Sequence, residues 1–368
     1  MGIHVISMCA ILAIIPLYWL PDLPDLHLVW LLIAAGVALS VQQRKWLRFS
    51  GLALLFMCWG ILAAQESVWP MNHLTKAPQQ AEVVITATDG ATMHQGKIVS
   101  LNGERVWGAM GVALYGNYLP QNVCVGQRWA MTLRLRAVHG ELNDGGYDSQ
   151  KNAFARHQTL SGRFSHAALV DEGCSLRAQY LTSLQNTLSA YQWGPVILGL
   201  GMGERLSVSR EIKNLMRETG TMHLMAISGL HIALAASVIW FLTRGIQFFL
   251  PGRWIIWQIP MLAGLIFAAF YAWLTGLQPP ALRTVIALVV LAALKMSGRQ
   301  WSPWQVWLTC VAAILVFDPL AVLSQSLALS AFAVAALIFW YQWLPLPHWQ
   351  RGRRLRPMVT LLYLQVSH

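Results

Sequence analysis

The sequence predicts a polytopic α-helical membrane protein with a small β-barrel domain inserted outside the bilayer, and three observations support this fold class. Hydrophobic residues make up 56% of the 368 residues and charged residues 11%, whereas soluble domains carry about 25% charged residues. Apolar runs recur on both sides of a polar segment at residues 65–190. That segment holds 10 basic and 9 acidic residues of the chain's 26 and 15. A soluble enzyme, a disordered chain and a secreted disulfide scaffold are therefore excluded.

Eight apolar runs are candidate membrane spans. Three lie before or at the start of the polar segment and form a first region, residues 1–64, and five lie within residues 222–368, with a truncated run at the end of the chain. Several are shorter than the ~20 residues of a straight span, so we expect tilted or broken helices. The runs lie at residues 3–20, 26–41, 48–64, 222–243, 254–275, 281–297, 303–317 and 320–344.

The charges between the runs orient the chain in the membrane. Lys and Arg gather in alternate loops, whereas the loop 21–25 is acidic. With every basic loop in the cytoplasm, residues 65–221 lie in the periplasm of a cell with two membranes, and the loop 345–358 lies inside. We therefore expect a multi-pass inner-membrane protein. The orienting residues are Arg44, Lys45, Arg48, Arg244, Arg253, Lys295, Arg299, Arg351, Arg353, Arg354 and Arg356.

The polar segment contains short β-rich stretches separated by turns. Asn102-Gly103 and residues 143–146 are the turn signals. Such short strands suit a small barrel such as an OB-fold, which we predict over residues 65–172. The β-rich stretches are residues 81–86, 96–101, 128–138 and 162–170.

Barrels of this kind often bind oligonucleotides. Arg134 and Arg136 are two residues apart and so share one face of a strand, where they would contact phosphate. The alternative, a solvated strand face with ordinary surface charges, stays open, and the net charge of the segment, 10 − 9 = +1, predicts only weak, salt-sensitive capture. The residues assigned to single-strand binding are Arg134, Arg136, Arg156 and Trp129, with Trp107 and Tyr115 as further stacking groups.

The cysteines divide between the spans and the exported segment. Cys9, Cys58 and Cys310 lie in apolar runs, where lone thiols act as small apolar residues. Cys124 and Cys174 are the remaining pair, and oxidising conditions outside the cytoplasm favour a bridge between them.

Residues 173–221 predict helices that lie in the membrane interface. From Leu176 an apolar stripe with helical spacing runs to Tyr191, and a second amphipathic piece spans residues 209–219. Ser207 or Ser209 is the expected cap of that second helix.

The stretch from residue 199 to residue 231 carries a family resemblance. It reads Gly199-Leu-Gly-Met-Gly-Glu-Arg205, then Thr219-Gly-Thr-Met-His-Leu-Met-Ala-Ile-Ser-Gly-Leu-His231. The second run resembles the competence domain of the ComEC family, inner-membrane channels that import single-stranded DNA during natural transformation. Weaker matches occur at Tyr271 to Gly276 with Pro280 and Arg283, at Asp318-Pro319 with Leu329-Ser330, and at residues 143–162.

The resemblance implies a competence-type membrane domain over residues 222–368 and a channel for DNA uptake. It also implies single-stranded DNA, a DNA-receptor protein and a cytoplasmic motor protein as partners beside the lipid bilayer, and a homo-oligomer is left open. Many members end in a metallo-β-lactamase-like domain. No His-x-His-x-Asp-His run occurs here, so we interpret the chain as a truncated member and expect no nuclease activity.

The candidate channel and motif residues combine small, hydroxyl, imidazole and charged side chains. Polar groups within spans usually face a cavity or a partner, which favours a role in lining the path of the strand. Ser228-Gly229 could instead permit close helix packing, and Arg283 could either contact phosphate or extend to the outer surface. The residues are Gly203, Glu204, Arg205, Gly220, Thr221, His223, Ser228, Gly229, His231 and Arg283.

Enzymatic interpretations of the same residues are weak. Rhomboid-type serine peptidases carry Gly-x-Ser-Gly on one helix and a His on another, but here Ala226 takes the first position and no later span contains a His. His223 and His231 are eight residues apart, a poor spacing for a metal, and the chain has no P-loop. We expect no metal and no cofactor. A transporter of another polar solute and a non-conducting membrane module remain alternatives to the channel.

Overall fold

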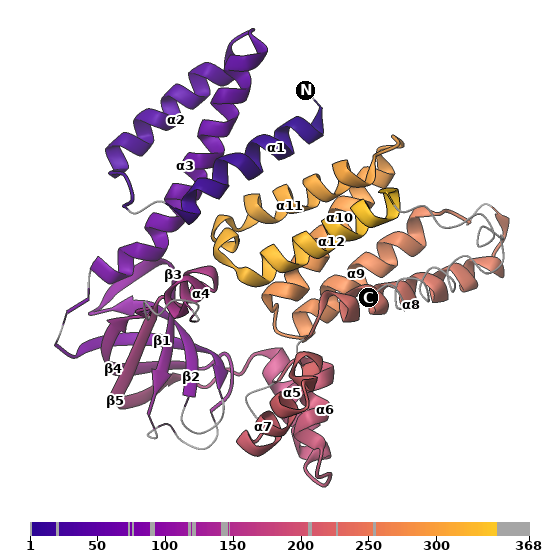
Figure 1. Cartoon of the computed structure of the whole chain (residues 1–368). Coiled ribbons are helices and arrows are strands. Elements are labelled where there is room, and N and C mark those ends of the chain that lie inside the picture. The colour runs from indigo at the N-terminus through magenta and orange to yellow at the C-terminus, as the bar shows by residue number, and fades with distance from the viewer. Residues whose placement is uncertain are drawn as a thin grey trace.

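The fold is taken from a computed structural model of the chain (Figure 1). It comprises three N-terminal helices, a β-barrel, a group of short helices and a second group of long helices. The structure describes residues 2–19, 22–72, 74–75, 77–88, 93–116, 119, 123–140, 146, 148–204, 208–225, 227–252 and 255–343.

The N-terminal helices form a three-helix unit with its own apolar core, centred on Val29, Cys58 and Ile61. A Cβ atom at Gly51 would lie 2.6 Å from the carbonyl oxygen of Gly36, so the second and third helices cross closely because both positions are glycine. The unit contains α1 (Ile3–Ile14), the 3₁₀ turn η1 (Ile15–Tyr18), α2 (Leu26–Val41) and α3 (Lys45–Asn72).

The polar segment folds as a closed five-stranded barrel in the order β1-β2-β3-β5-β4, which confirms the predicted fold class. The strand after Asn102-Gly103 was absent from the predicted β-rich stretches. Both turn residues have positive φ, 51° and 87°, as the two-residue turn of a tight hairpin requires. The turn at residues 143–146 lies mostly outside the described residues. The strands are β1 (Gln79–Thr88), β2 (Met93–Leu101), β3 (Glu104–Tyr115), β4 (Arg128–Ala137) and β5 (Leu160–Asp171).

Alternation along the strands builds the barrel interior. On β4, Trp129, Met131, Leu133 and Leu135 point inward and are buried, whereas Arg134 and its even-numbered neighbours point outward. The core is completed by buried apolar residues of the other four strands, among them Val83, Ile98, Val112, Leu114, Leu160 and Phe164.

One short helix lies between two barrel strands, and three more lead from the barrel to the second helical group (Figure 1). Ser209 caps α7 by accepting a hydrogen bond from the Ile212 N–H at 3.3 Å, as predicted; Ser207, the other candidate, lies outside the described residues. These helices are α4 (Ser149–Ala155), between β4 and β5, and α5 (Leu176–Leu188), α6 (Gly194–Met202) and α7 (Arg210–Glu218), which lie together below the long helices in Figure 1.

The second helical group packs around alanine and glycine. A Cβ at Gly264 would lie 2.8 Å from the Ala236 carbonyl oxygen, so the first two helices approach closely. Ile14 of α1 is buried against Ile314 and Leu315, which joins this group to the N-terminal unit. It comprises η2 (Thr221–Met225), α8 (Gly229–Phe248), α9 (Gln258–Leu274), α10 (Pro279–Met296), α11 (Pro303–Phe317), η4 (Pro319–Leu323) and α12 (Gln325–Trp343).

Four described helices, α3, α8, α10 and α12, are long and apolar enough to cross a membrane, and α1 with η1, α2, α9 and α11 are shorter apolar helices. The chain is therefore a multi-pass membrane protein. Two helices start later in the chain than the predicted runs 222–243 and 320–344. Residues 221–225 form a separate 3₁₀ turn before α8, and residues 319–323 form η4 before α12.

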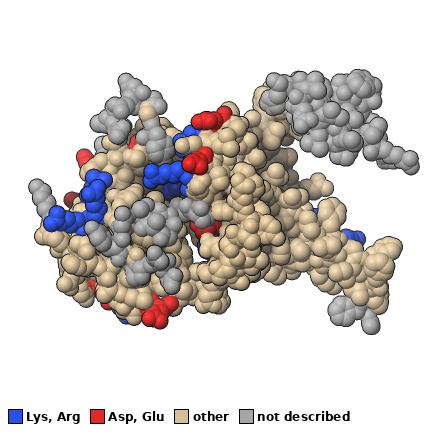
Figure 2. All heavy atoms as spheres, turned by 90° about the horizontal axis from the view of Figure 1, so that it is seen from below, with Lys and Arg blue, Asp and Glu red and all other residues tan. Residues whose placement is uncertain are grey.

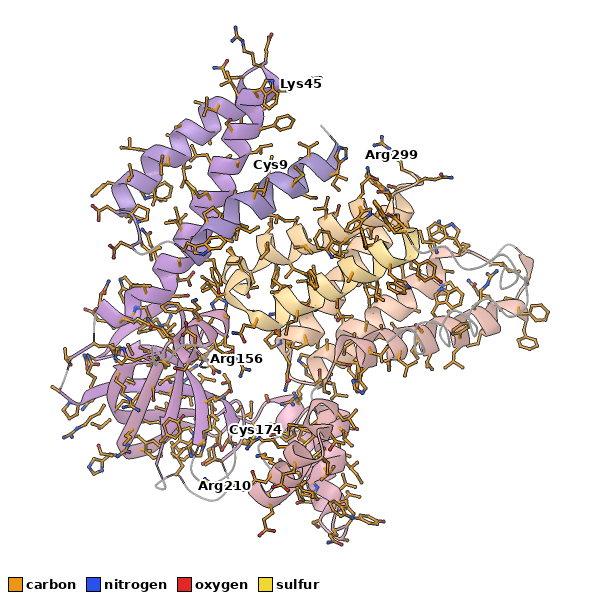
Figure 3. The ribbon with its side chains drawn as sticks, in the orientation of Figure 1. Cys9, Lys45, Arg156, Cys174, Arg210 and Arg299 are labelled. Carbon is orange, nitrogen blue, oxygen red and sulfur yellow. A yellow bond between two sulfur atoms is a disulfide. The ribbon has the colours of Figure 1, made fainter. Side chains whose placement is uncertain are left out.

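Charged side chains are unevenly distributed over the molecule. The face in Figure 2 is almost entirely uncharged over the long helices, and its charged side chains gather on the barrel side. Figure 3 shows Lys45 and Arg299 at the end of the helices that lies away from the barrel. The predicted cytoplasmic loop at residues 345–358 lies outside the described residues.

Candidate functional site

The outer face of the barrel carries a group of exposed arginines. In the antiparallel pair of β4 and β5, Arg134 lies directly opposite Arg163, and Arg136 lies opposite Ser161. All three arginines are exposed. The predicted pair Arg134 and Arg136 is thus joined by a third arginine from another strand.

The facing pair of Arg134 and Arg163 is unfavourable for the barrel alone, because like charges directly opposite on two strands are destabilising. Within the described part of the chain, neither residue forms a salt bridge with a carboxylate. An anion placed between the two guanidinium groups would remove the repulsion. This face is therefore suited to phosphate.

An aromatic side chain lies in the same row. Tyr115 of β3 pairs in register with Arg163 of β5, and its side chain is 43% exposed. Three strands thus present Tyr115, Arg163 and Arg134 side by side. We call Tyr115, Arg134, Arg136 and Arg163 the barrel patch.

Two of the predicted binding residues do not join the barrel patch. Trp129 is only 2% exposed and packs in the barrel core, so its predicted stacking role is wrong. The reason is the period of two: residue 129 differs from 134 by an odd number, which places it on the opposite face. Arg156 is exposed at the end of α4, on the side of the barrel that faces the long helices (Figure 3). The side chain of Trp107 lies outside the described part.

The predicted disulfide between Cys124 and Cys174 is present, with Cα atoms 5.8 Å apart. It ties the loop before β4 to the start of α5. Beside it, the Ser175 N–H donates to the Val125 carbonyl at 2.9 Å, and the Ser175 hydroxyl caps α5. The bridge therefore anchors the first turn of α5, in which Arg177 lies.

Arg177 joins two segments that the sequence singled out separately. Its Nε donates to the Leu274 carbonyl at 2.7 Å and its Nη2 to the Met202 carbonyl at 3.3 Å. These are the last carbonyls of α9 and α6, where helix dipoles favour a cation. Nη2 also lies 3.9 Å from the Glu204 carboxylate, and both side chains are at least four-fifths buried. Burial lowers the pKa of Arg177, which the Glu204 charge opposes.

Further bonds hold the same two segments together. The Tyr271 hydroxyl donates to the Gly201 carbonyl at 3.0 Å, and Gln278 Nε2 donates to the Gly203 carbonyl at 3.2 Å. Gly203 ends α6 with a φ of 73°, which favours glycine. Gly199 and Gly201 are helical, and only Gly203 makes the turn. We call Arg177, Glu204, Gly203, Tyr271 and Gln278 the helix junction.

Ser228 and His231 form the capping box of α8. His231 Nδ1 lies 3.0 Å from the Ser228 hydroxyl and accepts from the Ser228 N–H at 3.2 Å. As the sequence indicates, no later span supplies a His; the imidazole beside Ser228 comes from its own helix, α8. His231 Nδ1 is the atom that accepts the Ser228 N–H. The contact between the two side chains is therefore explained by capping of α8. A Cβ at Gly229 would overlap the Thr284 hydroxyl, so Gly229 permits close packing of α8 on α10.

The remaining motif residues make local contacts. Gly220 follows α7 with a φ of 68°, and the Thr221 hydroxyl lies 2.8 Å from that of Thr219. Arg205 lies outside the described residues, as does the side chain of His223.

Arg283 of α10 is held by two hydroxyls. Nη1 donates to Ser326 and Nη2 to Ser324, each at 2.8 Å. The structure thus fixes the guanidinium between helices. Among the described residues, no group of three His, Cys, Asp or Glu side chains could hold a metal ion.

Comparison with known proteins identifies relatives of the whole chain. A model described as "Competence protein" matches residues 200–367. "Uncharacterized protein YcaI" of Escherichia coli K12 is 58% identical over the full chain, which covers 49% of that protein. "Recombination protein 2" of Haemophilus influenzae and "Competence protein ComA" of Neisseria gonorrhoeae are each 30% identical, over 89% and 75% of the chain and 40% and 41% of those proteins.

The chain spans about half the length, or less, of the curated relatives it matches. No solved structure is a significant match. The competence model detects only the region from residue 200 onward, so the barrel and the N-terminal helices are matched through the individual relatives.

Proposed function

Because the chain belongs to the competence protein family, we propose that it is an inner-membrane channel component for the uptake of single-stranded DNA. In this proposal the barrel lies in the periplasm and receives the strand, and the long helices conduct it inward. A receptor and a cytoplasmic motor protein would supply the strand and the driving force.

The barrel patch is the observation that carries the proposal. Arg134 and Arg163 face each other without a carboxylate partner among the described residues, and Tyr115 continues their row. A basic row beside an exposed ring is the combination that holds single strands without reading their sequence. The mutual repulsion of the arginines is relieved when phosphate binds.

The distribution of basic residues supports the orientation. Lys45 and Arg299 lie at the end of the helices away from the barrel (Figure 3), and basic residues favour the cytoplasmic side. With that end inside, the barrel patch is outside, where an incoming strand would meet it.

Single-strand binding by the whole chain in lipid nanodiscs tests the proposal. Each phosphate contact contributes about −0.7 to the slope of log affinity against log salt. Replacing Arg134, Arg136 and Arg163 by Ala should therefore flatten the slope by up to about 2 and weaken all sequences alike.

The matched control replaces three other exposed arginines, Arg105, Arg210 and Arg217, by Ala. It changes the net charge equally but leaves the barrel patch intact, so its slope should stay near that of the unaltered chain. Equal slopes for both triple variants would overturn the role of the barrel patch.

Flux into proteoliposomes separates conduction from binding. Labelled single strands should enter vesicles that contain the chain, and duplexes should not. Uptake of a small polar solute with no affinity for single strands would favour the transporter, and binding without flux would favour the non-conducting module.

A further inference from the structure

The barrel is attached to the long helices at the end of α4. His157 has a φ of 53°, a left-handed conformation that is uncommon for residues other than glycine. A Cβ at Gly111 of β3 would overlap the His157 carbonyl oxygen, so the backbone of His157 is seated directly on the barrel wall.

The imidazole reaches the second helical group. His157 Nε2 lies 3.2 Å from a carboxylate oxygen of Asp318, the residue between α11 and η4. A second contact lies nearby, where the Lys151 ammonium of α4 sits 4.5 Å from the centre of the Tyr18 ring. The barrel thus meets the membrane helices through polar contacts that involve a titratable group.

Charges from three elements act on His157. Its hydrogen bond to Asp318 raises the pKa, burial lowers it, and the charge of Asp318 raises it further. Glu66 of α3 also raises the pKa, and Lys97 of β2 lowers it. The net result is a pKa above the usual histidine value. The charged form is therefore favoured where the barrel is docked.

Asp318 begins a segment that is held at its other end as well. Ser324 and Ser326 bind the two terminal nitrogens of Arg283. Residues 318–326 are therefore held by the barrel at one end and by α10 at the other. Displacement of the barrel would change the surroundings of Arg283.

We propose that His157 and Asp318 are positioning residues that form a latch between the barrel and the membrane helices, closed when His157 is protonated. The latch places the barrel patch relative to the bundle and couples its docking to the segment that holds Arg283. Its importance for DNA delivery rests on the proposed function, whereas the docking itself does not.

The direction of the pH dependence follows from the raised pKa. Protonated His157 binds Asp318 more strongly than the neutral ring, so docking is fully favoured at pH values below the undocked pKa. It is lost as the pH rises through the docked pKa. Since 42% of the His157 side chain is exposed, water screens the pair. We expect the ratio of docked to undocked barrel to fall about two- to five-fold between acidic and basic pH.

Spin labels on the whole chain in nanodiscs measure docking directly. We would attach labels at exposed Glu104 of the barrel and exposed Gln325 of the bundle, after replacing the free thiols Cys9, Cys58 and Cys310. Pulsed electron resonance then reports the fraction of molecules at the docked distance. That fraction should fall as the pH rises.

His157→Gln retains a hydrogen-bonding side chain but does not titrate, and Asp318→Asn removes the charge. Both should flatten the pH profile. His166→Gln is the matched control, because His166 is an exposed histidine of the same barrel and its loss should leave the profile unchanged. A profile that persists in His157→Gln would overturn the latch.

Oligonucleotide binding, measured on the same samples by fluorescence anisotropy, separates this inference from the proposed function. A normal pH profile without binding would support the latch and contradict the DNA role of the barrel patch. Binding with an unaltered profile in His157→Gln would contradict the latch and leave the DNA role standing.

Discussion

Arginine side chains have opposite surroundings in the barrel patch and in the helix junction. Arg134, Arg136 and Arg163 are exposed, and two of them face each other across a strand pair. Arg177 is largely buried and is occupied by two helix carbonyls and a carboxylate. An occupied cation stabilises the fold, whereas a cation without an acidic partner is available to a ligand. The surroundings of each guanidinium group, and not the residue type, therefore distinguish an arginine that could contact a ligand from one that holds the fold together.

The largest effect is expected from the link between the two regions. Cys124→Ser with Cys174→Ser opens a loop closed over a sequence separation of 50 residues. By the chain-entropy model this costs about 4 kcal/mol of stability. Hydrogen exchange should show lost protection in β4 and α5. Cys9→Ser, which removes a free thiol, is the control and should change neither; unchanged exchange in the double variant would mean that the bridge is dispensable.

Arg177→Met tests whether the helix junction is structural. It leaves the Leu274 and Met202 carbonyls without their donor and removes the buried cation 3.9 Å from Glu204, so we expect a loss of about 3 kcal/mol in the free energy of unfolding. Denaturation in detergent measures the loss. Arg177→Lys restores charge without the two-pronged geometry and should recover only part of it. A Met variant as stable as the unaltered protein would contradict the assignment.

Tyr115→Ala tests the aromatic member of the barrel patch. Loss of one stacked base costs about 1–3 kcal/mol, so affinity for single strands should fall roughly 5- to 150-fold with the salt slope unchanged. Anisotropy titrations at several salt concentrations measure both quantities. Tyr115→Phe retains the ring and should bind normally, and equal losses in both variants would show that the hydroxyl matters instead of stacking.

The smallest expected effect is a gain in barrel stability on replacing Arg163, and its sign tests whether the two facing arginines repel each other. Arg163→Gln removes the like charge opposite Arg134, so the barrel should gain up to about 1 kcal/mol of stability while single-strand affinity falls. The gain should shrink in high salt, which screens exposed charges. Arg105→Gln, which changes an exposed arginine paired with Ser100, is the control. A loss of barrel stability in Arg163→Gln would show that Arg163 has a structural partner.

Local patterns were sufficient for much of the architecture. Apolar runs predicted the membrane helices, and β-rich stretches with an Asn-Gly turn predicted a small barrel, because hydrophobic period and turn chemistry act over a few residues. The Cys124–Cys174 bridge was predicted because these two cysteines lie outside the apolar runs. The alternation that places Arg134 and Arg136 outside the barrel also places Trp129 inside it. The wrong stacking role of Trp129 arose because the alternation was applied only to the arginines.

Contacts distant in sequence were decided only by the tertiary structure. Arg177 meets Leu274 across 97 residues and His157 meets Asp318 across 161, and no spacing rule reaches that far. Arg163 joins Arg134 only through the register of two strands. The sequence by itself determined which segments are long and apolar, where most of the strands lie and which residues are charged. The tertiary structure decided which charged side chains have hydrogen-bond or ion-pair partners and which are exposed to ligands. This depends on the groups that packing brings within a few ångströms of each charge.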